Sequence, residues 1–204
     1  MKKFLITLAI LAGLSLIFFF NIYGFLSPNK PVVNAKILVV DAWLGDQELS
    51  QAAVVFKKGN YSRVLVPGGQ IERSLFFPGM KGHGELSAIV LISKGISPDK
   101  ITPLFVRAVK KDRTYQAALT VKHWLHKNKL DSCKINLFTA STHARRSWLL
   151  YKKVFTEKHA VGILSATPVK YDAKTWWKTS NGVRAVIDET IAFMYGFLFF
   201  HTNM

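Results

Sequence analysis

One short stretch of the chain combines hydroxyl, imidazole and guanidinium groups. Residues 135–142 begin as an apolar strand and end in small hydroxyl residues, and His143, Arg145 and Arg146 follow directly. A strand that leads into hydroxyl residues at a helix start directs free backbone N–H groups at one point, which favours an anion. We therefore predict that Thr139, His143, Arg145 and Arg146 form part of a ligand site. The alternative is an ordinary capped helix with solvated arginines.

A carboxylate follows the first apolar stretch of the chain, residues 35–40. Asp41 can orient a base, bind a cation or pair with Arg145 or Arg146. Alternatively, it is the turn acid that begins the next helix. His143 can act as a general acid or base near neutral pH, or donate to a phosphate oxygen. We assign Asp41 and His143 as the candidate catalytic residues, which would transfer protons.

Two further segments supply candidate ligand-binding residues. Five glycines lie within 68–84, where Gly68 and Gly69 are predicted to allow close backbone approach at the rim of the site. The segment has neither the Walker lysine nor a dinucleotide fingerprint, and long ordered loops of this kind tend to be lids. Arg113 and Thr114 begin a long predicted helix, and a basic helix start is unfavourable unless it serves an anion. Otherwise Arg113 is a surface charge.

No metal site is predicted. His123 and His126 lie beside lysines, and no acid or cysteine completes a ligand set with them. Ser141 lies outside a Gly-x-Ser-x-Gly turn, which weakens an interpretation as a serine hydrolase. The single Cys133 cannot form an intramolecular disulfide. These residues define no cofactor, substrate or oligomeric state.

Strands and helices are predicted to alternate along the chain. Nearly continuous apolar strands with helices between them indicate an α/β fold with a Rossmann-like, doubly wound parallel sheet of about five strands. We predict the strand order 3-2-1-4-5, which places Asp41 and the turn 139–146 at the switch point where such sheets bind ligands. The predicted strands are 35–40, 63–66, 101–106, 134–139 and 160–164, and the predicted helices are 46–58, 85–94, 112–128, 142–155 and 181–200.

The N-terminal segment is long and apolar enough to span a membrane. Residues 4–26 contain no charged residue, and about 20 apolar residues are needed for a span. We predict a cytoplasmic tip at 1–3, a transmembrane anchor at 4–26, a linker at 27–34 and an α/β domain at 35–204. Lys2 and Lys3 would keep the N-terminus in the cytoplasm and leave the domain outside it. The alternative is a cleaved secretory signal.

The chain is strongly basic, with 28 lysines and arginines against 12 acids and a net charge of +16. Such a charge favours anionic partners, including lipid head groups and phosphorylated ligands. Nucleic acid is not an expected partner, because the domain would face away from the cytoplasm and no basic helix face carries base-stacking aromatics. A solvated basic surface near an anionic membrane explains the charge as well.

The last predicted helix carries a stripe on one face, formed by Val183, Val186, Ile187, Thr190, Ile191, Met194, Phe197 and Leu198. The uninterrupted apolar run is too short to span a membrane. We therefore expect the stripe to pack on the sheet as part of the core.

Several motifs in fixed order resemble the SanA/YdcF-like (ElyC-type) bacterial proteins. The resemblance covers about residues 35–195 and implies a Rossmann-like domain, often tethered by an N-terminal membrane helix, with roles in envelope integrity and peptidoglycan or lipid-carrier metabolism. This chain differs from many members at the first strand, where Asp41 replaces a glycine-rich turn. The motifs are Asp41 to Asp46, Gly68-Gly69, Asp112 to Tyr115 with Ala118, Thr139 with His143 to Arg146, Tyr171-Asp172 with Trp176-Trp177, and Ser180 to Arg184 with Glu189.

The resemblance and the residues together lead to two functional expectations. The first is an enzyme of the bacterial inner membrane, single-pass with its domain outside the cytoplasm, that acts on a phosphate-bearing envelope precursor such as a lipid-linked ligand. Arg113, Arg145, Arg146 and Arg184 would then hold the anion. The second is a non-catalytic binding or scaffold protein for envelope assembly that uses the same pocket.

Overall fold

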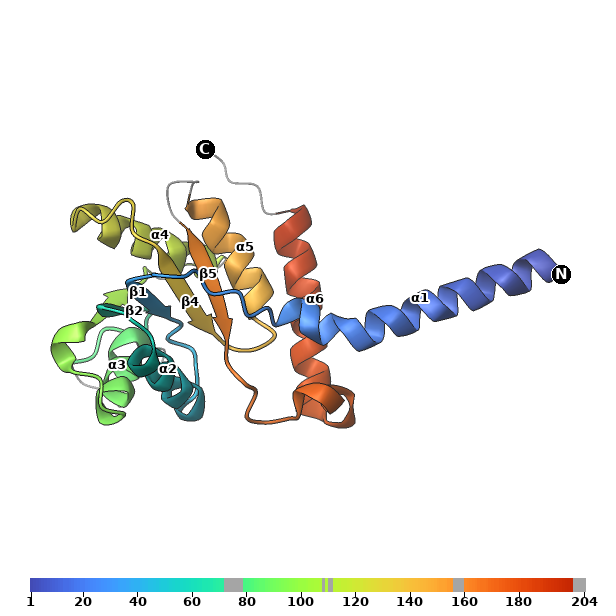
Figure 1. Ribbon diagram of the computed structural model, residues 1–204, viewed down its shortest axis with the longest axis horizontal. Helices are drawn as coiled ribbons and strands as arrows, with labels where there is room; N and C mark the ends of the chain where they lie inside the picture. Colours follow the sequence, from blue (N-terminus) through green and yellow to red (C-terminus); the bar gives the residue numbers. More distant parts are fainter. Residues whose placement is uncertain (72–78, 108, 110–111, 156–159, 200–204) are drawn as a thin grey trace.

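The structure, a computed structural model, describes residues 1–71, 79–107, 109, 112–155 and 160–199. It is an α/β fold with five parallel strands, and the strand order β3-β2-β1-β4-β5 confirms the predicted topology. Figure 1 shows the sheet with helices on both faces and the N-terminal helix extending away from it. The strands are β1 (Ile37–Val40), β2 (Arg63–Gly68), β3 (Ile101–Phe105), β4 (Ile135–Thr139) and β5 (Val161–Ser165).

The helices follow the predicted alternation, with ends shifted by one or two residues. Residues 72–78 of the predicted 68–84 loop and residue 200 of the last predicted helix lie outside the described residues. The helices are α1 (Lys2–Leu26), α2 (Asp46–Lys58), α3 (His83–Ser93), α4 (Arg113–Lys127), α5 (Ala144–Val154) and α6 (Ser180–Leu198), with short 3-10 helices η2 (Pro98–Lys100) and η3 (Ala173–Lys178).

Alternation along β1 explains the two layers of the core. Leu38 and Val40 point to one face of the sheet and pack under α2 and α3. Ile37 and Val39 point to the other face and pack under α4 and α5. Successive side chains of a strand point to opposite faces, so a strand buried on both sides is apolar throughout. All four β1 residues are accordingly buried.

The predicted linker lies along the edge strand β5. The backbone of Lys30 exchanges two hydrogen bonds with Ile163, N to O at 2.8 and 3.0 Å. The buried Asn136 side chain on β4 accepts from the Val32 N–H at 2.7 Å and donates to the Val32 carbonyl at 3.1 Å. These bonds join the chain after α1 to the sheet.

A third apolar cluster joins the end of α1 to α6 and η3. Ile22 and Leu26 of α1 are buried against Trp176 and Val186. α1 is long and apolar enough to cross a membrane, and its first 18 residues are almost entirely exposed. The globular part therefore contacts only the last turns of this helix.

The expectation that the apolar stripe of α6 packs on the sheet is wrong. α6 packs instead on α5, η3 and the end of α1, and it buries Gly182, Val186 and Gly196. The stripe residues Ile187, Ile191, Met194 and Leu198 are between 49% and 65% exposed. Val183 and Val186 of the predicted stripe pack toward the end of α1 and η3, whereas Ile187, Ile191, Met194 and Leu198 face outward.

Candidate functional site

Two adjoining cavities open at the carboxyl ends of β1 and β4, on the side predicted from the strand order. The inner cavity has a volume of about 420 Å³ and is lined by residues of the β2 end, α4 and α5. The outer cavity, of about 1020 Å³, lies between the start of α4, the β4–α5 turn and α6. Asp41, Trp43, Arg113 and Thr114 line both. We call the two together the cleft.

Asp41 lies where the two cavities meet. It follows β1 directly, and β1 pairs with β4, so Thr139 at the end of β4 lies beside it. The fully buried Thr139 hydroxyl donates to Asp41 Oδ2 at 3.0 Å, and the Trp43 N–H donates to Oδ1 at 3.2 Å. Thr139 therefore orients the Asp41 carboxylate instead of contacting a ligand with this hydroxyl.

His143 lies between two carboxylates. Its Nδ1 is 2.8 Å from Glu189 Oε1, and its Nε2 is 3.7 Å from Asp41 Oδ2. A carboxylate can only accept, so Nδ1 carries the proton in this pair. In the neutral ring Nε2 is then unprotonated and available beside Asp41, which is the arrangement of a general base whose tautomer is fixed by an acid.

Arg146 forms a two-pronged ion pair with the same glutamate. Its Nε and Nη2 donate to Glu189 Oε2 and Oε1 at 2.9 and 3.0 Å. Arg146 Nη2 also lies 2.9 Å from His143 Nδ1. Because both nitrogens carry protons in this arrangement, the pair is a close contact, and His143 Nδ1–H donates its hydrogen bond to Glu189. Burial raises the pKa of Glu189, but hydrogen bonds and charges of His143 and Arg146 outweigh it and lower the pKa to about 2.

The structure does not bring Arg145 or Arg184 to the cleft. Arg145 Nε donates to the Phe25 carbonyl of α1 at 2.7 Å, and its guanidinium stacks 4.4 Å from the Phe25 ring. Successive helix residues point about 100° apart, so Arg145 and Arg146 diverge. Arg184 is exposed on α6 and lines neither cavity formed by the described residues.

Arg113 and Thr114 line both cavities from the first turn of α4. The Arg113 guanidinium lies 5.2 Å from the centre of the Trp43 ring, a cation–π contact at the rim. The Asp112 side chain at the N-cap makes no hydrogen bond to this helix end. The helix dipole and an arginine at the start of α4 make a positive end to the cleft.

A buried hydroxyl without a partner lines the inner cavity. Ser147 is 1% exposed, and its Oγ has no hydrogen-bond partner among the described residues. The phenol of Tyr151 lines the same cavity, and burial, followed by the charge of Asp41, raises its pKa well above the ordinary value. A buried hydroxyl without a partner costs about 1–3 kcal/mol, which a bound acceptor would recover.

The two glycines have different places. An added Cβ on Gly68 would collide with the backbone of Gly84, so Gly68 is required for the close packing of β2 against α3. Gly69 lines the inner cavity, where a Cβ would come within van der Waals distance of the Trp43 ring. Only Gly69 of the pair therefore lies at the cleft.

The hydroxyl-rich turn differs from its sequence interpretation. Thr139 is bonded to Asp41, and the Ser141 hydroxyl lies 3.1 Å from the Tyr171 hydroxyl. Both groups are thus used within the protein. At the start of α5 these side-chain hydroxyls are already hydrogen-bonded within the protein. The first turn of α4 and Ser147 line the same inner cavity and are better placed to bind an anion.

Sequence reasoning did not assign Glu189 or Ser147 to the site. Each carries a local signal, because each is a polar residue among the inward-facing residues of its helix. Glu189 lies among the inward residues of α6, and Ser147 lies between Ala144 and Tyr151 on the buried face of α5. Within the described part of the chain, no group of three or more His, Cys, Asp or Glu residues is placed to hold a metal ion.

Comparison of the chain with models of protein families, with curated proteins and with solved structures gives no match in any of the three.

Proposed function

We propose that this chain is a membrane-anchored envelope protein that binds a phosphate-bearing precursor in the cleft and hydrolyses a phosphate bond in it. The observation that carries the proposal is the position of His143, with Nδ1 on Glu189 and Nε2 facing Asp41 in a cavity-lining position. A positioned imidazole with a fixed tautomer is suited to proton transfer from water.

In the proposed reaction, His143 Nε2 takes the proton of a water molecule that attacks phosphorus. The bond from phosphorus to the leaving oxygen breaks, and the imidazolium gives its proton to that oxygen, so one phosphate-bearing ligand and one water give two products and neutral His143 is restored. Glu189 holds the ring through Nδ1, and the Asp41 carboxylate, 3.7 Å from Nε2, stabilises the imidazolium that forms. Arg146 keeps Glu189 in place through its two hydrogen bonds.

The phosphate would lie toward the first turn of α4. Arg113 and the Ser147 hydroxyl, which has no partner among the described residues, supply donors to anionic oxygens, and the positive end of the α4 dipole favours them. Arg107 adds a second positive charge at the rim of the inner cavity. Asp41 is the one acid that lines this cavity among the described residues, so its potential is positive on balance.

The membrane and envelope parts of the proposal rest on α1 and on the resemblance to SanA/YdcF-like proteins. α1 is apolar and long enough to serve as an anchor. With Lys2 and Lys3 in the cytoplasm, the domain would be outside, where lipid-linked envelope precursors are handled. We propose family membership on the same residues that carry the resemblance.

A non-catalytic binding protein is the second candidate. The bidentate ion pair between Arg146 and Glu189 favours this second function. The pair occupies Arg146 Nε and Nη2, the groups that a catalytic arginine would offer to phosphate. A binder would use the cleft and the start of α4 without turnover.

Phosphate release by the full chain in nanodiscs, with a polyprenyl diphosphate as the probe, separates these functions. We expect turnover by the wild type and a loss of about 100-fold or more in His143→Gln, with binding retained. His126→Gln is the matched control, because His126 also contacts an acid, Asp131 at 2.8 Å, but lies on the exposed surface. Binding without turnover in every variant would select the binder, and neither binding nor turnover would refute both.

A further inference from the structure

The outer side of α6 carries exposed apolar side chains, where a water-exposed helix would carry polar ones. Four exposed residues of the predicted stripe, Ile187, Ile191, Met194 and Leu198, recur at intervals of four, three and four, so they form one continuous strip. We call this strip the α6 outer stripe. The same helix buries Gly182 and Val186 on its opposite side. An apolar strip of this length on a surface helix marks an interaction surface.

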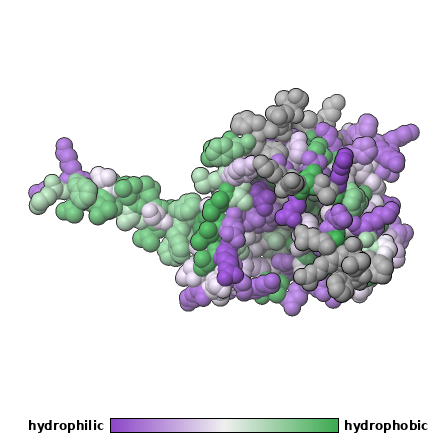
Figure 2. Space-filling model, turned by 180° about the vertical axis from the view of Figure 1, so that it is seen from behind, coloured by the Kyte–Doolittle hydropathy of each residue, from purple (hydrophilic) through white to green (hydrophobic). Residues whose placement is uncertain are grey.

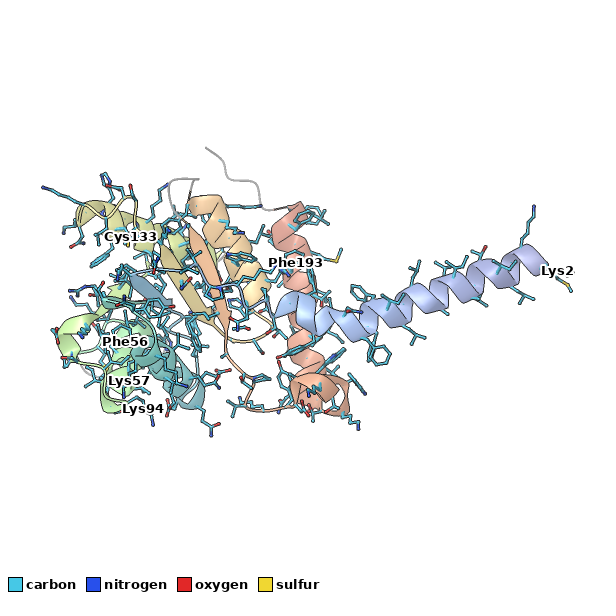
Figure 3. All side chains as sticks on the ribbon, in the orientation of Figure 1. Lys2, Phe56, Lys57, Lys94, Cys133 and Phe193 are labelled. Atoms are coloured by element: carbon cyan, nitrogen blue, oxygen red, sulfur yellow. The ribbon has the colours of Figure 1, made fainter. Side chains whose placement is uncertain are left out.

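The helix that carries the strip lies beside the end of α1. Figure 1 shows α6 at the edge of the globular part from which α1 departs, with α6 running across the direction of α1. In Figure 3, Lys2 marks the far end of α1 and Phe193 lies where α1 reaches α6. The rings of Phe193 and Phe25 are 5.1 Å apart at that crossing. Figure 2 shows apolar surface continuing from α1 onto the adjoining side of the globular part.

The free length of α1 is too short to span a bilayer alone. Contacts with the domain begin at Phe19, whose ring lies 5.0 Å from Trp176 and 5.4 Å from Trp177. The 15 residues from Phe4 to Phe18 rise about 22 Å, whereas the hydrocarbon core is about 30 Å thick. The domain itself must therefore enter the remaining hydrocarbon to a depth of about 8 Å. Interfacial helices are buried to a similar depth, about 5–10 Å.

The residues around this junction match a lipid interface. Trp177 and Tyr23 pack in the cluster that joins α1 to α6 and η3, and Tyr195 is exposed on α6. Tryptophan and tyrosine are enriched at membrane interfaces. Lys174 and Lys178 are exposed beside Trp177, where they can contact anionic head groups. A membrane explains the apolar strip, the aromatic residues and the lysines together.

We infer that the α6 outer stripe lies in the surface of the bilayer that holds α1, so that the outer cavity opens at the level of the lipid head groups. This rests on the proposed topology, in which α1 is a membrane anchor. Ile191, Tyr195 and Gly196 of α6 line that cavity together with Arg113, Thr114 and His143. A lipid-linked ligand would then place its phosphate toward the first turn of α4 while its chain stays in the bilayer.

Depth measurements on the full chain in nanodiscs test the inference. Single cysteines in a Cys133→Ser background would carry a fluorescent label at Met194 on the stripe, at Ile10 on α1 or at Val54 on α2. These three side chains are similarly exposed, at 53%, 57% and 49%. We expect brominated lipids to quench the Met194 label at least about twice as strongly as the Val54 label, and the Ile10 label most strongly.

Each outcome has a distinct meaning. Strong quenching at Ile10 with equal, weak quenching at Met194 and Val54 would overturn the inference while leaving the anchor in place. Weak quenching at Ile10 would refute the anchor, and the inference with it, without bearing on phosphate binding in the cleft. If the label at Met194 escaped quenching only in discs that hold two chains, the stripe would be a contact with a second copy. That result would also overturn the inference.

Discussion

Glu189 of α6 and His143 of the β4–α5 turn are 46 residues apart in sequence and 2.8 Å apart in the structure. The bond ties the last helix to the turn at the end of the sheet. It also sets which nitrogen of His143 faces Asp41, because an ionised carboxylate holds the proton on Nδ1. Helix α6 is thus part of the candidate site as well as a partner of α1.

The first prediction concerns the stability of the fold at acid pH. The folded-state pKa of Glu189, about 2, lies below its ordinary value of 4.5. A depressed pKa stabilises the fold above pH 4.5, by about 3 kcal/mol, and this contribution is lost as the pH falls from 4.5 toward 2. Glu189→Gln should therefore lower the free energy of unfolding at pH 7. The stability of this variant should also change less than that of the wild type between pH 4.5 and 2.

Thermal and urea unfolding of the full chain in detergent at several pH values would check this. Glu48→Gln is the control, because Glu48 is half-buried at a helix start, where its carboxylate accepts the Gly45 N–H. Equal pH profiles for wild type and Glu189→Gln would show that the ion pair contributes no net stability.

The second prediction uses the unpartnered hydroxyl of Ser147. Ser147→Ala removes a buried polar group without a partner, so we expect unchanged stability or a gain of up to about 1 kcal/mol. The same variant should bind phosphate-bearing probes several-fold more weakly. Titration and thermal melts of one preparation give both quantities. A clear loss of stability would mean that Ser147 already has a partner in the protein.

The third prediction separates three arginines by position. Arg113→Ala removes a guanidinium at the start of α4 and should weaken phosphate binding by about 1.5–3 kcal/mol, at least about tenfold. Arg145→Ala should leave binding unchanged and loosen α1, because Arg145 bonds to the Phe25 carbonyl. Arg184→Ala should change neither.

Isothermal titration at two salt concentrations distinguishes a specific contact of Arg113 from general attraction to a basic protein. The assignment fails if Arg145→Ala weakens binding as much as Arg113→Ala does.

The fourth prediction concerns the segment after α1. An added Cβ on Gly162 would collide with Asn136 Oδ1 and with the Val32 N–H, the pair that holds this segment on the sheet. Gly162→Ala should therefore release Val32, and Asn136→Ala should do the same by removing both bonds, at a cost of about 1–3 kcal/mol. Faster hydrogen exchange at the Val32 amide would report the release. Retained protection in both variants would mean that other contacts hold the segment.

Local sequence pattern determined the elements and their order. Apolar strands bounded by glycine and turn residues predicted β1 to β5, and the alternation with helices predicted the order β3-β2-β1-β4-β5. From that order followed the closeness of Asp41 and Thr139, because parallel strand ends meet at one edge of the sheet. The apolar segment 4–26 likewise predicted a single long helix, and α1 contains it.

The tertiary structure alone decided which way side chains on these elements face. Arg145 and Arg146 are adjacent, but docking of α5 against α1 and α6 turned one to Phe25 and the other to Glu189. The spacing of α6 predicted an apolar stripe, but only packing decided that Gly182 and Val186 face inward and Met194 outward. Periodicity depends on neighbours within a few residues, whereas the orientation of a helix depends on elements distant in sequence, and a single sequence carries little information about those contacts.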